Sequence, residues 1–591
     1  MSVGSVGGDA GPGRWRAGLG RLVAGAALLT AVALLPWLSG NDPALTVLRA
    51  RSADQDPTPA QLAAVREQLG LDDGPFTHLA HWLGGLLGGD AGTSWVSGEA
   101  VLPQVTAAFA VSFTLMLGAL VVTLAVAALV SARTLYLGSR RRLRRGRGAT
   151  GAAVLAALPK FLLASLLATV GGVWLGWFPS SGWEGPSSMV LPALALGVPS
   201  GAMIGGLLDQ ALPAAFHEPW ARTWWAHGFA PGRIARHALR RTLAGVLPQL
   251  LPTVVSLVGG AVAVEKIFNI PGLGRLALDA AIAQDLPPLQ TAALVLVLLG
   301  TTAGLLIQAL RRALLGPALR DGALPALHPP ALPRSRRSHW VAGACAAALL
   351  TMVVAGLLRD PLHVDTAARL LSPSSAHPLG TDALGRDLLA RLGHGALRTV
   401  GVALAVTAVC TVTGLLLGMA AQVGAGLTEA VSTLPAVLAG MLATAVTGGP
   451  SVWGAAGAVC LVGWTPYAAQ AAALLEQERA SGHMLASLSF GAGPGYLLRH
   501  HLLPAVLPAV VRNALLRLPT TVLVLASLGF LGLGEQPPTA EWGRLLSENQ
   551  PYVELAPWTV LGPGCALVLL SVLAVSGTAA GRSGARRAAH L

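Results

Sequence analysis

The sequence predicts an all-α protein that crosses a membrane many times. Of its 591 residues, 53% are hydrophobic and only 11% are charged, whereas a soluble domain carries about 25% charged residues. The basic residues fall in short clusters between long apolar runs, as the positive-inside rule expects. Most of the chain therefore requires lipid. We interpret the net charge of +13 as membrane topology, with no nucleic-acid partner.

The first half of the chain, residues 1–310, holds six expected spans. A basic N-terminus precedes an apolar run that ends near Leu38, and its near-spanning length favours an uncleaved first helix over a signal peptide. The other spans are expected near residues 105–131, 150–172, 188–210, 243–266 and 289–310. Residues 41–103 are polar and acidic and predict a small external, extracytoplasmic domain, in which Thr58 starts a capped helix. The basic segment at 211–242 is expected in the cytoplasm.

A second set of six spans follows a basic, proline-containing cytoplasmic linker at 311–339. These spans are expected near residues 340–358, 396–421, 427–447, 452–474, 504–532 and 559–579. Residues 340–591 thus repeat the layout of the first half, including one long cytoplasmic segment between the fourth and fifth spans, at 475–503. About 12 spans in two halves of like orientation predict a pseudo-two-fold pair with a pathway between the halves. Both termini are expected in the cytoplasm.

A glycine-centred motif lies in the cytoplasmic segment of the first half. It reads WARTWWAHG from Trp220 to Gly228, and a basic stretch that contains His237 follows. This motif resembles the cytoplasmic loop of the permeases of binding-protein-dependent ABC importers, and it is most similar to the branch for dipeptides, oligopeptides and nickel. Glycine permits a tight turn between two short helices. The copy departs from the family pattern at Trp224, where a small residue is usual, and at His237, which lies one residue closer to the glycine than expected.

The second half carries a more divergent copy of this motif. It centres on Gly491, which is preceded by Leu485, Ala486 and Ser487, and His501 follows at the spacing of the family. Leu485 stands where the family has an acidic residue.

Other segments resemble the same family in the same order along both halves. They are residues 69–72, 89–94, 159–161 and 265–275 of the first half and residues 377–387 and 530–543 of the second half. The two sets resemble two different permease types. The resemblance therefore implies two non-identical permease subunits joined in one chain.

This resemblance implies the permease component of an ATP-driven ABC importer in a bacterial plasma membrane. Two cytoplasmic ATPase subunits and an extracytoplasmic solute-binding protein are the implied partners, and peptides or a related solute such as nickel or a metal chelate are the implied substrates. The residues implied to dock on the ATPases are Arg222, Thr223, Trp224, Gly228, Leu485, Ala486, Ser487 and Gly491. The sequence has no G-x-x-x-x-G-K-[ST] motif. We therefore expect ATP hydrolysis on separate subunits, and no catalytic, cofactor-binding or metal-ligating residues here.

Lys160 and one polar cluster allow other interpretations. Lys160 lies about ten residues into the expected third span, ~15 Å deep at about 1.5 Å per residue, where a lysine is costly. It either lines the pathway or pairs or snorkels at the boundary between the halves. Asp382, Arg386 and Asp387 suggest an acid–base cluster, but we expect ion pairs and caps that stabilise a loop. An ion-coupled secondary transporter and a non-transporting membrane scaffold are the alternative functions.

Overall fold

The computed structural model describes residues 58–68, 74–143, 150–247, 250–315, 336–420 and 434–588, together with a few isolated positions. Within these residues the regular elements are helices, and β-pairing is confined to two isolated bridges, Thr93–Ala100 and Thr381–Asp387. The predicted all-α fold is therefore confirmed. The first expected span and most of the expected linker at 311–339 lie outside the described residues.

The helix expected after Thr58 is α4 (Pro59–Gln68). The Thr58 hydroxyl accepts a hydrogen bond from the Gln61 N–H at 3.4 Å, and the Gln61 side-chain oxygen accepts one from the Thr58 N–H at 2.9 Å. This reciprocal capping box satisfies two N–H groups at the helix start, which confirms the predicted cap.

The first half continues with a series of helices up to its last span. They are α5 (Pro75–Leu87), α6 (Val101–Ser139), α7 (Thr150–Ala157), α8 (Lys160–Leu167), the π-helix η2 (Ala168–Trp174), the 3-10 helix η3 (Pro186–Met189), α9 (Val190–His217), α10 (Pro219–Ala226), α11 (Pro231–Val246), α12 (Leu250–Ile267), α13 (Leu273–Ala283) and α14 (Leu286–Leu315).

The second half repeats this order with its own helices. They are α15 (Arg336–Leu357), the 3-10 helix η6 (Thr366–Ala368), α16 (Leu388–Met419), α18 (Ala436–Thr447), α19 (Val452–Gly463), α20 (Thr465–Arg479), α21 (Gly482–Ser489), α22 (Pro494–Leu497), the π-helix η7 (Leu498–Leu502), α23 (Leu503–Leu531), α24 (Trp542–Asn549), the 3-10 helix η8 (Gln550–Tyr552) and α25 (Trp558–Ala588).

Most of the expected spans coincide with long apolar helices. Among the described residues, seven helical segments are long and apolar enough to cross a membrane: Val101–Ser139, Pro186–His217, Leu286–Ile307, Trp340–Leu357, Leu388–Met419, Val452–Arg479 and Pro494–Leu531. Shorter apolar helices lie at three further expected spans: Lys160–Trp174, Ala436–Thr447 and Trp558–Leu573. Helix α12 occupies the expected fifth span. The chain is polytopic, and from the second span onward the described spans follow the same order in each half.

The third span of the first half is interrupted. Helix α7 ends at Ala157 and α8 begins at Lys160, because a proline disfavours helical backbone at the residue before it. Pro159 precedes α8 with φ −61° and ψ 130°, and Pro435 precedes α18 with φ −64° and ψ 135°. The family resemblance of residues 159–161 to the start of the third span agrees with this helix start, whereas Lys160 is the first residue of α8 and does not lie about ten residues into a helix.

Glycines set the close packing of neighbouring spans. Three glycines, spaced four residues apart, lie on the face of α9 that contacts α6: Gly197, Gly201 and Gly205. A Cβ on Gly201 would lie 2.6 Å from the Thr123 carbonyl oxygen and 2.7 Å from Val126 Cβ, so the approach requires a residue without a side chain. In the second half the corresponding close contact is between α16 and α20. There the glycines, Gly414 and Gly418, lie on α16, which is the second span, and they face α20.

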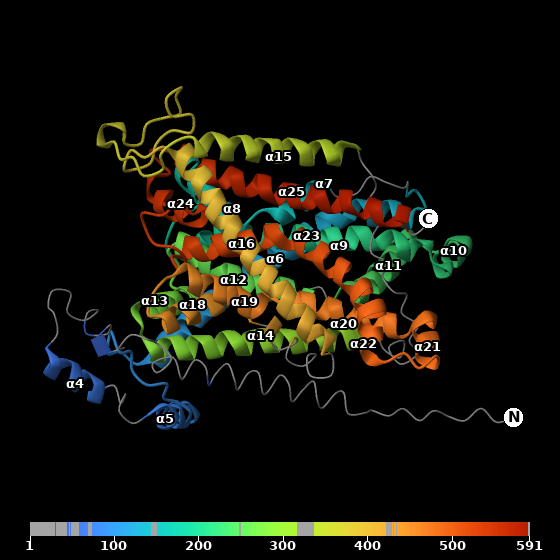
Figure 1. Cartoon of the computed structure of the whole chain (residues 1–591), viewed down its shortest axis with the longest axis horizontal. Helices are drawn as coiled ribbons and strands as arrows, with labels where there is room; N and C mark the ends of the chain where they lie inside the picture. Colours follow the sequence, from blue (N-terminus) through green and yellow to red (C-terminus); the bar gives the residue numbers. More distant parts are fainter. Residues whose placement is uncertain are drawn as a thin grey trace.

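The two halves have like orientation, as predicted (Figure 1). The short helices α10 and α21, which follow the fourth span of each half, lie at one end of the molecule. Helices α13 and α24, which follow the fifth spans, lie at the opposite end. We call these the α10–α21 end and the α13–α24 end.

The two halves contact each other where α23 finishes, toward the α13–α24 end. The Lys266 ammonium donates hydrogen bonds to the carbonyl oxygens of Leu531 at 3.0 Å and Phe530 at 3.4 Å. A cation at the C-terminus of a helix is stabilising. Phe161 of α8 stacks on Phe530, with ring centroids 5.3 Å apart, so the start of α8 also lies at the boundary between the halves.

Candidate functional sites

The first motif folds as a short helix that ends at a left-handed glycine. Helix α10 finishes just before Gly228, whose φ is +71°. The Gly228 N–H donates to the Trp225 carbonyl at 3.2 Å, and the Phe229 N–H donates to the Trp224 carbonyl at 3.1 Å. This pair of hydrogen bonds is a Schellman motif, whose positive φ favours glycine.

The second motif repeats the same geometry. Helix α21 finishes before Gly491, whose φ is +79°. The Gly491 N–H donates to the Leu488 carbonyl at 3.0 Å, and the Ala492 N–H donates to the Ser487 carbonyl at 3.1 Å. A proline three residues after each glycine starts the next helix: Pro231 in the first half and Pro494 in the second. The divergent second motif therefore keeps the turn of the first.

His237 of α11 lies beneath α10, against two indole rings. Its ring centroid is 4.6 Å from that of Trp220 and 4.7 Å from that of Trp224. Burial, together with the charges of Arg241 and a neighbouring arginine, lowers the pKa of His237, and the carboxylate of Glu218 acts against them. The neutral imidazole therefore fixes α10 to α11 through aromatic contact.

His501 takes the same place beneath α21. Its Nε2 lies 3.0 Å from the Ser487 hydroxyl oxygen, and its ring centroid is 5.5 Å from that of His483. His501 stands ten residues after its glycine, whereas His237 stands nine residues after its own. The π-helix η7 absorbs the extra residue, because its i→i+5 hydrogen bonds accommodate one more residue than an α-helical turn.

The exposed surfaces of α10 and α21 differ in chemistry. Arg222 and Thr223 are exposed on α10, and the matching positions on α21, Leu485 and Ala486, are also exposed. The Leu485 side chain is 58% exposed and that of Phe490, directly after α21, is 89% exposed. The first helix thus presents a cation, and the second presents an apolar surface.

Trp224 and Ser487 face the interior of their motifs, whereas Lys160 lies outside both motifs. Trp224 stacks on Phe229 with ring centroids 4.9 Å apart, and Ser487 contacts His501. Lys160 belongs to neither motif. Its side chain packs beside α12, where a Cβ added to Gly260 would lie 2.7 Å from Lys160 Cδ.

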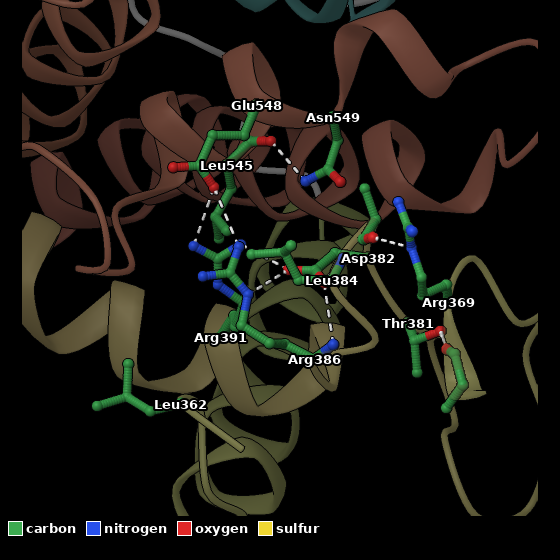
Figure 2. A network of polar contacts seen from close by, with 12 residues as sticks. Leu362, Arg369, Thr381, Asp382, Leu384, Arg386, Arg391, Leu545, Glu548 and Asn549 are labelled. Atoms are coloured by element: carbon green, nitrogen blue, oxygen red, sulfur yellow. Dashed lines mark hydrogen bonds and ion pairs between the residues drawn. The ribbon is translucent and has the colours of Figure 1, made fainter. Parts of the chain in front are cut away.

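The ion pairs expected in the second half form one network at the α13–α24 end (Figure 2). Asp382 accepts hydrogen bonds from Arg386 Nε at 2.7 Å and from Arg391 Nη1 at 2.8 Å. Arg391 is 0% exposed and extends to Glu548 of α24 at 3.0 Å. The Asp387 carboxylate caps the start of α16. These contacts confirm the structural interpretation of the cluster, and they tie the segment before α16 to α24.

A hydroxyl group from the second span caps the helix that follows the fifth span in each half. Ser112 Oγ of α6 accepts the N–H of Leu273, the first residue of α13, at 2.7 Å. Thr399 Oγ1 of α16 accepts the N–H of Trp542, the first residue of α24, at 3.3 Å. Each hydroxyl group stands eleven residues after the first residue of its helix, so the internal repeat extends to single hydrogen bonds.

A buried carboxylate accompanies each of these helix starts, but it comes from a different element in each half. Glu265, near the end of α12, accepts hydrogen bonds from the Ser112 hydroxyl at 2.6 Å and from a backbone N–H of α13 at 2.9 Å. It occupies space that a side chain on Gly272 would fill. In the second half the roles are exchanged, because Gly529 lies near the end of α23 and the carboxylate belongs to Glu541, just before α24.

Glu265 and Glu541 lie in segments that resemble the family, but the sequence did not predict the role of either carboxylate or the burial of Arg391. A signal was present, since aligning the two halves on the ends of their fifth spans places Glu265 opposite Gly529. Aligning them on the starts of the following helices places Gly272 opposite Glu541. No such signal marked Arg391, whose burial depends on α24 packing against the segment before α16.

Two helical halves of like orientation, with matching glycine turns at one end, define a polytopic membrane permease built from two domains. Residues 134–316 and residues 410–580 each match the family described as binding-protein-dependent transport system inner membrane component. The two matches cover more than half of the chain, so the protein belongs to this family and carries its domain twice, as fused permease halves.

The relatives of this chain match 38% to 49% of its length. The probable D,D-dipeptide transport system permease protein DdpC of Escherichia coli (strain K12) is 34% identical over 234 residues, which are 38% of this chain and 78% of the relative. The dipeptide transport system permease protein DppC of Alkalihalophilus pseudofirmus is 31% identical over 38% of this chain and 76% of its own length. The metal-staphylopine import system permease protein CntB of Staphylococcus aureus (strain NCTC 8325 / PS 47) is 28% identical over 49% of this chain and 92% of its own length.

Proposed function

We propose that this protein forms both transmembrane halves of an ATP-driven importer that carries peptides, or a related small solute such as a metal chelate, into the cytoplasm. The observation that carries the proposal is the pair of Schellman-capped helices, α10 and α21, at the same end of the molecule. Two short exposed helices offer one attachment to each of two separate ATPase subunits. The substrate class follows the names of the relatives, which are permeases for D,D-dipeptides, dipeptides and metal-staphylopine.

The charge of the α10–α21 end supports a cytoplasmic placement. Four arginines follow the Gly228 turn on α11: Arg233, Arg236, Arg240 and Arg241. Basic segments beside membrane spans favour the cytoplasmic side. With this orientation both termini lie in the cytoplasm of a bacterial cell, and the α13–α24 end faces an extracytoplasmic solute-binding protein.

The helical segment after the second glycine turn can transmit a movement of the ATPase across the membrane. In the second half, Pro494–Leu531 is one helical segment of 38 residues, ~57 Å long at about 1.5 Å per residue. Its first turn follows Gly491, and its last residues accept the hydrogen bonds of Lys266. When the ATPases close, a rigid displacement of α21 tilts this segment and separates it from Lys266. The pathway then opens at one end as it closes at the other.

We further propose that Lys160 lines the pathway. The neighbouring Phe161 stacks on Phe530 of the other half, so the start of α8 lies at the boundary between the halves. A lysine at this boundary offers a positive charge to the carboxylate of a peptide or a chelate, which accounts for a lysine at the start of an apolar helix.

The proposal is tested by uptake into proteoliposomes that contain this protein with candidate ATPase and binding-protein subunits. We expect uptake of a labelled dipeptide or metal chelate to require both ATP hydrolysis and the binding protein. Uptake that follows an ion gradient without ATP would instead indicate a secondary transporter. Absence of transport under both conditions, with all subunits assembled, would favour the scaffold.

A further inference from the structure

Glu541 is a buried carboxylate that has no role in the proposed transport cycle. Its side chain is 8% exposed, and its carboxylate lies against Gly529 at the end of α23. Among the described residues, Glu541 Oε2 has no hydrogen-bond partner. The corresponding carboxylate of the first half, Glu265, accepts hydrogen bonds at both of its oxygens. The two halves therefore hold their buried carboxylates in different hydrogen-bonding states.

A small cavity beside Glu541 contains a second carboxylate. The cavity has a volume of about 20 Å³, and its polar lining residues are Arg398, Thr399, Glu535 and Glu541. This volume admits one water molecule. Glu535 Oε1 accepts a hydrogen bond from Arg398 Nη1 at 2.8 Å, while Glu535 Oε2 is buried and has no partner in the described part of the chain. Two glutamates, each with one buried carboxylate oxygen that lacks a donor among the described residues, thus line one cavity.

We propose that Glu541 is a proton-binding site, in which one proton is held between Glu541 Oε2 and the Glu535 carboxylate, directly or through one water molecule in this cavity. The proton turns two acceptors into a donor and an acceptor, so it satisfies both oxygens at once. A metal cation fits the cavity less well, because the Arg398 guanidinium already forms an ion pair with Glu535 at 2.8 Å.

Burial and the charge of Glu535 favour the protonated form of Glu541. Burial, followed by the negative charge of Glu535, raises the pKa of Glu541 to about 8, and Arg544 of α24 acts in the opposite direction. An isolated glutamate has a pKa of about 4.3. The stabilisation that this proton gives to the folded state is therefore complete below about pH 4, and it is lost as the pH rises toward about 8.

The proton site joins the two ends of the segment that links α23 to α24. Glu535 follows the end of α23 at Leu531, and Glu541 precedes the start of α24 at Trp542. Deprotonation leaves two negative charges beside one small cavity, which is costly, so it favours detachment of this segment from α23. The external location of the site rests on the proposed function, whereas proton binding itself does not.

The test is an infrared titration of the purified full-length protein in lipid nanodiscs, from about pH 5 to about pH 10. We expect the wild type to keep a protonated carboxyl band at neutral pH, with a midpoint near pH 8, and the Glu541→Gln variant to lack that band. Glu265→Gln is measured in parallel, so that the infrared signal of the other buried carboxylate is distinguished from that of Glu541. Glu554→Gln removes an exposed carboxylate beyond α24 and should leave the band unchanged.

A second variant keeps the test valid if Glu541→Gln fails to fold. Glu535→Gln removes the negative charge that disfavours ionisation of Glu541, so the midpoint of the band should move to lower pH. A band with a midpoint near pH 8 that persists in Glu541→Gln, or a midpoint that stays in place in Glu535→Gln, would overturn the proposal. Neither measurement needs ATPases, a binding protein or a substrate, so failure here is distinct from failure of the transport proposal.

Discussion

His237 and His501 lie in the same place beneath α10 and α21, although one follows its glycine by nine residues and the other by ten. The π-helix η7 in the second half compensates for the extra residue. The two motifs therefore preserve a three-dimensional arrangement that their sequences only partly share. This shared arrangement supports the proposal that both motifs, the divergent second one included, attach to the ATPases.

The glycine turns give the first prediction. Gly228→Ala or Gly491→Ala should strain its turn by about 1–2 kcal/mol, because a Cβ disfavours the positive φ at both positions. We expect reduced ATP-dependent uptake with normal abundance in the membrane. The matched controls are Gly232→Ala and Gly493→Ala, where a Cβ meets open space and φ is not positive. Equal uptake by the turn variants and the controls would refute a role for the turns.

The pKa of His237 gives a prediction about pH. Burial and the nearby arginines lower this pKa, so the folded state binds fewer protons than the unfolded state. The contribution of the neutral ring to stability is full above about pH 6.5, and it decreases as the pH falls toward the lowered value. Amide hydrogen exchange in α10, corrected for intrinsic rates, should therefore be faster relative to α21 at about pH 5.5 than at about pH 7.5.

The corresponding control is His237→Asn, which removes the titrating ring. This variant should show the same ratio of exchange in α10 and α21 at both pH values. A ratio that still changes with pH in the variant would assign the effect to another group.

The contact between α6 and α9 gives a prediction about stability. Gly201→Ala places a Cβ against the Thr123 backbone, so it should destabilise the protein by about 1–3 kcal/mol. Gly206→Ala is the control on the same helix, because a Cβ there meets no atom within 4 Å. Melting temperatures in detergent should fall for the first variant and stay near the wild-type value for the second. Similar melting temperatures would contradict the packing argument.

Much of this architecture is visible in the sequence, because hydropathy and charge act locally. The spans, the repeat of the halves, the two glycine turns and the capping box at Thr58 depend on residues close together in the chain. The exchange of Glu265 and Glu541 between elements was not visible, since it depends on where α12 and α23 meet the helices that follow them. Residues 159–161 resemble the family's third-span start, where α8 begins, but hydropathy averaged over 150–172 does not resolve the break before them.

Lys160 gives a prediction about transport. If it faces the pathway, Lys160→Ala should lower the apparent affinity for a carboxylate-bearing substrate by about tenfold, which corresponds to ~1.4 kcal/mol. Lys160→Arg keeps the charge and should retain most of the uptake. Protein abundance should be unchanged in both variants. Unaltered uptake by Lys160→Ala would place the residue in a purely structural role at the boundary between the halves.

The central claim, that α10 and α21 each attach to an ATPase, is tested most directly by site-specific cross-linking in the assembled complex. In a chain without its native cysteines, the variants Arg222→Cys and Leu485→Cys place one thiol on the exposed face of each helix. Leu87→Cys is the control, because it is 92% exposed on α5 near the opposite end. We predict cross-links to the ATPase subunits from both helix positions and none from the control. Absence of a cross-link at both Arg222→Cys and Leu485→Cys, in a complex shown to be assembled, would contradict the claim.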